Sequence, residues 1–216
     1  MKKMIIVFSL SFFAFTPCNE NKTKTKKIVT KMTDKKETTF RSKILILPGL
    51  WNSGEKHWQT MWERSNPEFT RVIQQDWENP ECRDWVEALD KKVVESGIEN
   101  VILVGHSLAC PTIAFWAHKY NRKIKGALLV APVDTEADTF PSEPKGFSPI
   151  PMNKLPFRSI IVASSNDPYA TLERSKLFAK NWGSEFINIG EAGHISSASG
   201  LGSWNYGLEI LKKLDK

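Results

Sequence analysis

Residues 101–109, VILVGHSLA, place a serine where it can act as a nucleophile. An apolar run at residues 101–104 leads into GHSLA at residues 105–109 and then into a helical pattern, which is the outline of a nucleophile elbow. In such a turn the hydroxyl of Ser107 is lifted clear of the sheet, and the next backbone N–H faces an incoming carbonyl oxygen. The motif ends in alanine instead of the usual glycine, so a serine that merely caps the helix stays an alternative.

Four histidines compete for the role of general base, and their positions in the sequence separate them. His106 lies inside the elbow, where its side chain should point away from Ser107, and His118 lies about three turns along the next helix. His57 follows the first strand but opens a helix. His194, in the EAGHI loop just past the last strand, is the histidine that we expect to take the proton from the serine.

An orienting carboxylate should follow a strand that lies between the elbow and His194. Asp167, in the SSNDP turn after an apolar run, meets this condition and would hold the imidazole in one tautomer. Asp134, which follows the preceding strand, is the alternative. With Asp167 the chain order is serine, aspartate, histidine, which is the order typical of α/β-hydrolases.

The same chemistry needs two backbone N–H groups to stabilise the developing oxyanion. One is the N–H of Leu108, directly after the serine. The other should come from the LPGLW loop after the first strand, where we assign the N–H of Leu50 and keep that of Trp51 as an alternative.

Short apolar runs alternate with amphipathic ones from Lys43 onward, which predicts strands alternating with helices. Nearly continuous Val, Ile and Leu runs are typical of parallel strands buried on both faces. We therefore expect a three-layer α/β/α sandwich with a mostly parallel sheet of about six strands. The expected strands are 43–47, 70–74, 100–104, 125–130, 159–164 and 185–189, and the expected helices are 57–64, 82–96, 108–120, 171–182 and 204–214.

Residues 131–158 hold six of the twelve prolines, which is too many for a helical cap, so no large cap domain is expected. This segment follows a strand at the edge of the sheet where function is concentrated. Phe140 and Phe147 are therefore candidates to line a pocket, with an ordinary surface loop as the alternative.

Charge divides the 216 residues into a basic start and a nearly neutral remainder. Residues 1–43 hold 11 Lys or Arg and 3 Asp or Glu, whereas the rest holds 19 and 21, so the net charge of +6 comes from the start of the chain. We expect one folded domain at 43–216, a basic flexible linker at 19–42 and no nucleic-acid partner.

Residues 1–18 have the features of a signal peptide or lipoprotein leader. The uncharged run at 4–15 follows two lysines and is shorter than the roughly 20 residues that a membrane span needs. Cys18 could then carry a lipid anchor, and the protein would be periplasmic or anchored to a membrane. The alternative is a cytoplasmic protein whose translation starts at Met32.

Cysteine and histidine spacing indicates neither a disulfide framework nor a metal site. Cys18 lies in the leader, which leaves Cys82 and Cys110 for the domain. We expect no metal ion and no organic cofactor.

The chain resembles the family of small single-domain serine hydrolases that includes retinoblastoma-binding protein 9 and the bacterial YdeN-like proteins. The resemblance extends over nearly everything from Lys43 onward. It implies an α/β-hydrolase fold without a large cap, Ser107, Asp167 and His194 as a catalytic triad, and hydrolysis of ester or amide bonds in small substrates. The leader has no counterpart in typical cytosolic members. The matching segments are LPGLWNSGEKHWQTMWE (47–63), VGHSLA (104–109), LLVAPVD (128–134), ASSNDPY (163–169), NWGSE (181–185) and EAGHISSASGLGSW (191–204).

Eight tryptophans are many for this length, and most should be core residues. Those next to the expected site, Trp51, Trp58 and Trp204, together with Phe140, are candidates to line the substrate pocket. We expect a carboxylesterase-like enzyme that forms an acyl-enzyme. The alternatives are a thioesterase or amidase with the same triad, and a binding protein on a hydrolase scaffold that contacts a partner through its proline-rich loop or aromatic surface.

Overall fold

The computed structural model describes residues 40–216. Six parallel strands form one sheet in the order β2-β1-β3-β4-β5-β6. The strands are β1 (Lys43–Leu47), β2 (Phe69–Arg71), β3 (Val101–His106), β4 (Gly126–Val130), β5 (Arg158–Ala163) and β6 (Glu185–Asn188). The helices are α1 (Trp58–Ser65), α2 (Cys82–Ser96), α3 (Ala109–Tyr120), α4 (Leu172–Trp182) and α5 (Asn205–Lys212), with short 3-10 turns at Ile98–Asn100 and Ser197–Ser199.

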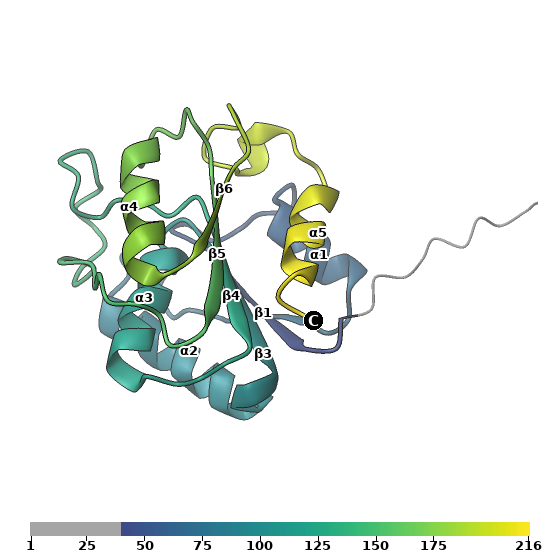
Figure 1. The fold of residues 1–216 in the computed structure, drawn as a ribbon. Coiled ribbons are helices and arrows are strands. Elements are labelled where there is room, and N and C mark those ends of the chain that lie inside the picture. The colour runs from purple at the N-terminus through teal and green to yellow at the C-terminus, as the bar shows by residue number, and fades with distance from the viewer. Residues whose placement is uncertain (1–39) are drawn as a thin grey trace, which may run out of the picture. The chain divides into compact units, whose positions relative to one another are not determined.

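The helices cover both faces of the sheet, which confirms the expected α/β sandwich. Figure 1 shows α2, α3 and α4 on one face and α1 and α5 on the other. Each face has its own apolar core, because every residue of β3 and β4 is buried and successive side chains point to opposite faces. The uninterrupted apolar runs that predicted a parallel sheet therefore supply both cores at once.

Residues 40–42, which the sequence assigns to the linker, pack with the domain. Phe40 is buried and its ring meets that of Phe69 edge-on at 5.0 Å. The carboxylate of Asp215 accepts hydrogen bonds from the N–H groups of Arg41 at 2.7 Å and Ser42 at 3.0 Å, and it pairs with Lys125. We call this contact the Asp215 clamp. The leader at 1–18, Cys18, Met32 and linker residues 19–39 lie outside the described residues.

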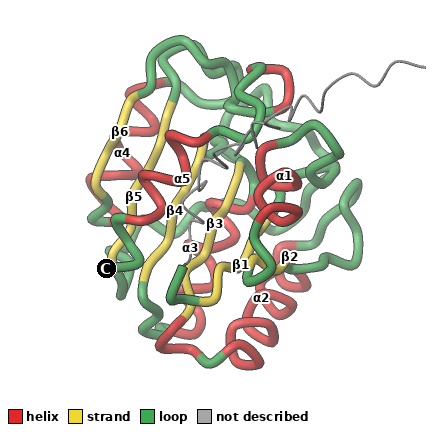
Figure 2. Tube along the Cα trace, turned by 90° about the vertical axis from the view of Figure 1, so that its right-hand side faces the viewer, coloured by secondary structure: helices red, strands yellow, loops and turns green. Residues whose placement is uncertain are grey.

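The segment between β4 and β5 has no helix, as its prolines predict. It runs along the side of the sheet that α3 and α4 cover, at the left of Figure 1. Figure 2 shows the opposite face, where α1 and α5 lie in front of the strands. Two hydrogen bonds link distant parts of this segment to each other. The hydroxyl of Thr135 donates to the carbonyl of Phe147 at 2.5 Å, and Glu136 accepts the N–H of Ile150 at 2.9 Å. Phe147 is 2 % exposed and packs on Trp85 in the core, so it does not line a pocket.

Among residues 40–216, none of the helices combines the length and the apolar character that crossing a membrane takes.

Candidate active site

Ser107 lies in the tight turn between β3 and α3, at the carboxyl edge of the sheet. Its φ of +57° falls in the left-handed region, which is uncommon for a residue other than glycine and is typical of a strained functional turn. Two glycines make room for this turn. A Cβ on Gly105 would stand 2.8 Å from Cδ1 of Ile113, and one on Gly49 would stand 2.7 Å from Cβ of Ser107. The elbow that the sequence predicts is therefore present.

A continuous hydrogen-bond chain joins the three side chains that the sequence singles out. Nε2 of His194 lies 2.8 Å from Oγ of Ser107, and Nδ1 lies 2.9 Å from both carboxylate oxygens of Asp167. The carboxylate makes Nδ1 the protonated nitrogen, so Nε2 is left as an acceptor for the serine proton. The Asp167 side chain is 4 % exposed and that of His194 is 13 % exposed, so most bulk water is excluded from this pair.

Asp134, the alternative carboxylate, has a different partner. Its Oδ1 lies 3.0 Å from the guanidinium of Arg174, which also pairs with Glu136. Asp134 thus ties the loop after β4 to helix α4, whereas Asp167 contacts the imidazole.

The loop that carries His194 is fastened to the turn that carries the aspartate. Oδ1 of Asn166 accepts the N–H of Gly193 at 2.7 Å, and Oγ of Ser164 accepts the N–H of Ala192 at 2.9 Å. These bonds fix the distance between the two loops from which the imidazole and the carboxylate project. Sequence reasoning missed both residues, although their place in the SSNDP turn after β5 is a usable signal.

Two of the other three histidines, His106 and His57, pack near His194. The ring of His106 stands 4.9 Å from that of His194, and its Nε2–H donates to the His194 carbonyl at 2.9 Å. His57 caps α1, because its Nδ1 accepts the N–H of Gln59 at 3.2 Å, and its ring lies 4.8 Å from His106. His118 is exposed on α3. Sequence reasoning did not anticipate the contact of His106 with the base.

Burial keeps both of these inner histidines neutral. It lowers the pKa of His57 from about 6.5 to about 4, with nearby Arg71 and His194 acting in the same direction. Burial likewise holds the pKa of His106 well below its ordinary value.

The backbone N–H groups that the sequence singles out for an oxyanion differ in their hydrogen bonding. Across residues 40–216, no hydrogen bond engages the N–H of Leu50 or that of Leu108. The N–H of Trp51, by contrast, donates to the carbonyl of Trp77 at 2.8 Å. This bond occupies the alternative donor, and Leu50 and Leu108 stay the expected pair.

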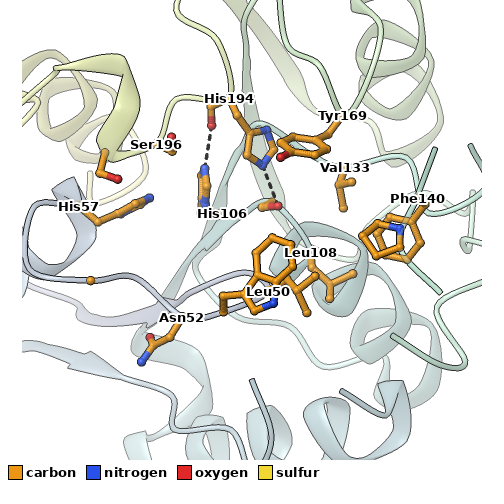
Figure 3. Close-up of a pocket in the computed structure, with 15 residues that line it drawn as sticks. Leu50, Asn52, His57, His106, Leu108, Val133, Phe140, Tyr169, His194 and Ser196 are labelled. Carbon is orange, nitrogen blue, oxygen red and sulfur yellow. Dashed lines mark hydrogen bonds between the residues drawn. The ribbon is translucent and has the colours of Figure 1, made fainter. Parts of the chain in front are cut away.

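A cavity of about 270 Å³ opens over Ser107 (Figure 3). Trp51 and Phe140 belong to its wall, as expected. The residues that line it are Leu50, Trp51, Asn52, Gly54, His57, His106, Ser107, Leu108, Val133, Phe140, Pro141, Tyr169, His194, Ser196 and Ser197.

Trp58 and Trp204 are not part of this wall, which corrects the sequence-based expectation. They are 1 % and 5 % exposed, and their rings meet at 5.0 Å in the core between the sheet, α1 and α5. The indole N–H of Trp58 donates to the carbonyl of Ile195 at 2.8 Å. Trp58 thus contacts the loop that carries His194, and Trp204 packs against Trp58.

A model of the family described as serine hydrolase matches residues 44–213. The chain belongs to this serine hydrolase family. A YdeN-like hydrolase from Pectobacterium atrosepticum is 31 % identical to this serine hydrolase, with a TM-score of 0.70, and the match covers 80 % of this chain and 89 % of that chain. The comparison with curated proteins gives no match.

More distant structures share the fold of this serine hydrolase. The ydeN gene product of B. subtilis is 18 % identical, with a TM-score of 0.66, over 79 % of this chain and 97 % of that chain. An esterase from Thermogutta terrifontis, in a butyrate-bound structure, is also 18 % identical, with a TM-score of 0.56, over 84 % of each chain. The family and the YdeN-like hydrolase from Pectobacterium atrosepticum support hydrolase activity.

Proposed function

We propose that the protein hydrolyses ester or amide bonds of small acyl substrates through a covalent acyl-enzyme on Ser107. The observation that carries this proposal is the hydrogen-bond chain from Ser107 Oγ through the imidazole of His194 to the carboxylate of Asp167. A serine hydroxyl is a weak nucleophile until a base removes its proton, and this chain supplies that base in the required orientation.

In the first half of the reaction, Oγ of Ser107 attacks the substrate carbonyl while Nε2 of His194 takes the hydroxyl proton. The imidazolium that forms is stabilised by Asp167, which stays ionised. The carbonyl oxygen becomes an oxyanion, and the N–H groups of Leu50 and Leu108 hydrogen-bond to it. Removing one such donor typically costs about 3 kcal/mol of transition-state stabilisation.

The first half ends with loss of the leaving group, and in the second half the acyl group is transferred to water. His194 first gives its proton to the departing alcohol or amine, which breaks the bond to the acyl carbon. A water molecule then takes the place of the leaving group, and Nε2 of His194 removes its proton as it attacks the acyl-enzyme. Collapse of this second oxyanion releases the carboxylic acid and returns the proton to Ser107.

Labelling with a fluorophosphonate probe tests this function, because the probe phosphonylates only an activated serine. We expect the wild-type protein to be labelled. We expect Ser107→Ala to lose labelling completely and His194→Ala to lose at least 99 %, since removing a triad member lowers reactivity by several powers of ten. In-gel fluorescence and intact-protein mass spectrometry measure the result.

Two matched variants control for general damage to the fold. Ser165→Ala and His118→Ala change an exposed serine and an exposed histidine, and both should be labelled like the wild type. Labelling that persists in Ser107→Ala contradicts the nucleophile assignment. A folded wild-type protein that is not labelled favours a binding protein on a hydrolase scaffold.

A further inference from the structure

The Ser107–His194 pair divides the cavity into two sides of different chemistry. Figure 3 shows Asn52, His57, His106 and Ser196 on one side of His194, and Leu108, Val133, Phe140 and Tyr169 on the other. The His194 ring lies between the ring of His106, at 4.9 Å, and the ring of Tyr169, at 4.6 Å. A substrate carbonyl held at Ser107 would send one substituent to each side.

Apart from the hydroxyl of Tyr169, the side chains labelled on the apolar side offer no hydrogen-bonding group. Leu108 and Val133 are 1 % and 4 % exposed, and the part of each side chain that faces the cavity is hydrocarbon. Phe140 packs against the same core and closes the wall together with Pro141. Burying a methylene group on such a surface favours binding by about fourfold.

Contacts behind the cavity wall hold the segment that carries Val133 and Phe140 in place. Arg174 on α4 pairs with Asp134 at 3.0 Å and also with Glu136, and its side chain is 18 % exposed. The N–H of Phe140 donates to the carbonyl of Ala137 at 2.9 Å. A wall fixed in this way sets a limit on the size of the group that it contacts.

The polar side presents hydrogen-bonding groups, and the fixed charge beside it, the guanidinium of Arg71 against Asn52, is neutralised by Glu63 at 2.6 Å. Its hydroxyl and amide groups come from Ser196 and Asn52, and its imidazoles from His57 and His106. Burial lowers the pKa of both histidines, so they are neutral at pH 7 and offer no counter-charge to an anion. This side suits an uncharged group that can form hydrogen bonds, such as the oxygen-bearing alcohol part of an ester.

We propose that the apolar side is the acyl subsite, that Phe140 limits the length of the acyl chain, and that the substrates are uncharged esters of short acyl groups. This assignment rests on the proposed function. An acyl chain must stay bound while water attacks the acyl-enzyme, which favours the buried apolar side. The alcohol gains a hydroxyl as it departs, which favours the polar side. A cavity of about 270 Å³ is also below the range of about 300–1,000 Å³ that accommodates drug-sized ligands.

A series of p-nitrophenyl esters with the full chain tests the assignment. With acetate, butyrate, hexanoate and octanoate, we expect kcat/KM of the wild type to be highest at acetate or butyrate and at least tenfold lower at octanoate. Phe140→Ala should raise the octanoate-to-butyrate ratio of kcat/KM by about tenfold, because it lengthens the subsite. Phe140→Trp should act in the opposite direction and lower the butyrate-to-acetate ratio.

Two controls make the readout specific. Tyr206→Ala truncates an aromatic residue that is 53 % exposed on α5, and its chain-length profile should equal that of the wild type. The ratio of kcat/KM for 4-methylumbelliferyl acetate to that for p-nitrophenyl acetate reports on the leaving group. That ratio should not change in either Phe140 variant.

The outcomes separate this assignment from the proposed function. If both Phe140 variants keep the wild-type chain-length profile, or if they change the leaving-group ratio instead, the acyl assignment is overturned while the proposed function stands. A wild-type protein that hydrolyses none of the four esters and resists fluorophosphonate overturns both. A wild-type protein that is labelled but hydrolyses none of the esters overturns the ester assignment alone.

Discussion

Two aspartates follow neighbouring strands of the sheet, and a different partner holds each one. The carboxylate of Asp167 receives Nδ1–H of His194 at 2.9 Å and the N–H of Tyr169 at 2.9 Å. The carboxylate of Asp134 forms an ion pair with the guanidinium of Arg174 instead. We therefore expect Asp167 to fix the tautomer of His194 and to stabilise its charge, whereas Asp134 holds the loop after β4 against α4.

Replacing each aspartate by asparagine should separate these two roles. In Asp167→Asn the amide can donate to Nδ1, which favours the wrong imidazole tautomer, and we expect kcat for p-nitrophenyl acetate to fall by roughly 10⁴-fold. Asp134→Asn should keep kcat within about threefold of wild type, because it weakens an ion pair away from the imidazole. Equal losses in the two variants would contradict this division of roles.

For individual residues, the sequence predicts the positions of side chains at strand ends better than the positions of side chains in or beside helices. Ser107, Asp167 and His194 could be located because a residue just past a parallel strand must lie at the carboxyl edge of the sheet. Trp58 and Trp204 were misplaced because closeness in sequence to the site does not say which way a helical side chain faces. The contact of His106 was missed because it depends on the path of a loop 88 residues away.

Among the elements, the loop after β1 depends on the neighbouring edge strand for its shape. Trp51 and Asn52 have φ values of +62° and +66°, a conformation that costs energy outside glycine. The guanidinium of Arg71, at the end of β2, donates to Oδ1 of Asn52 at 2.8 Å and to the carbonyl of Ser53 at 3.1 Å. Glu63 pairs with the same guanidinium at 2.6 Å.

Removing this support should slow catalysis without changing substrate affinity. Arg71→Ala frees the loop that positions the N–H of Leu50, and we expect kcat to fall by about tenfold with KM within about twofold, since an oxyanion donor acts in the transition state. Arg122→Ala breaks a comparable pair with Asp90 on the far side of the domain and is the matched control. Steady-state kinetics on p-nitrophenyl acetate measure both, and a tenfold rise in KM for Arg71→Ala would contradict the explanation.

Helix α2 was predicted to the residue, whereas the edge strand β2 was not. Helix α2 has the expected bounds because Trp85, Leu89 and Val93 repeat at helical spacing and are all buried. The expected strand at 70–74 is observed at Phe69–Arg71 instead. It pairs on one side only, and its bonding to β1 ends where the N–H of Val72 donates to the carbonyl of Ile46. Ile73 is already 70 % exposed, so the apolar pattern extends past the strand.

The molecule as a whole holds two neutral histidines inside it, and this makes its stability depend on pH. In the unfolded chain His57 takes up a proton at its ordinary pKa of about 6.5, whereas in the folded protein it does so only near a pKa of about 4. Between these values the unfolded state binds more protons, so the free energy of unfolding decreases as the pH falls. His106 contributes with the same sign.

His57→Asn should reduce this acid sensitivity while keeping the cap of α1, since asparagine also accepts the N–H of Gln59. Between pH 7 and pH 4.5 we expect the variant to lose about 2 to 3 kcal/mol less unfolding free energy than the wild type. Urea titrations followed by circular dichroism at each pH measure the difference. His118→Asn, on an exposed position, should follow the wild-type curve, and the explanation fails if His57→Asn follows it too.

The Asp215 clamp brings the beginning and the end of the folded domain to one place, beside the first residues of β1 and β4. Figure 1 shows the C-terminus next to the start of β1. The cavity lies at the opposite ends of these strands. A reporter domain, an affinity handle or a solid support joined at either end of the domain is thus attached behind the catalytic edge. In a tethered arrangement of that kind, substrate approaches from the free side and product leaves by it.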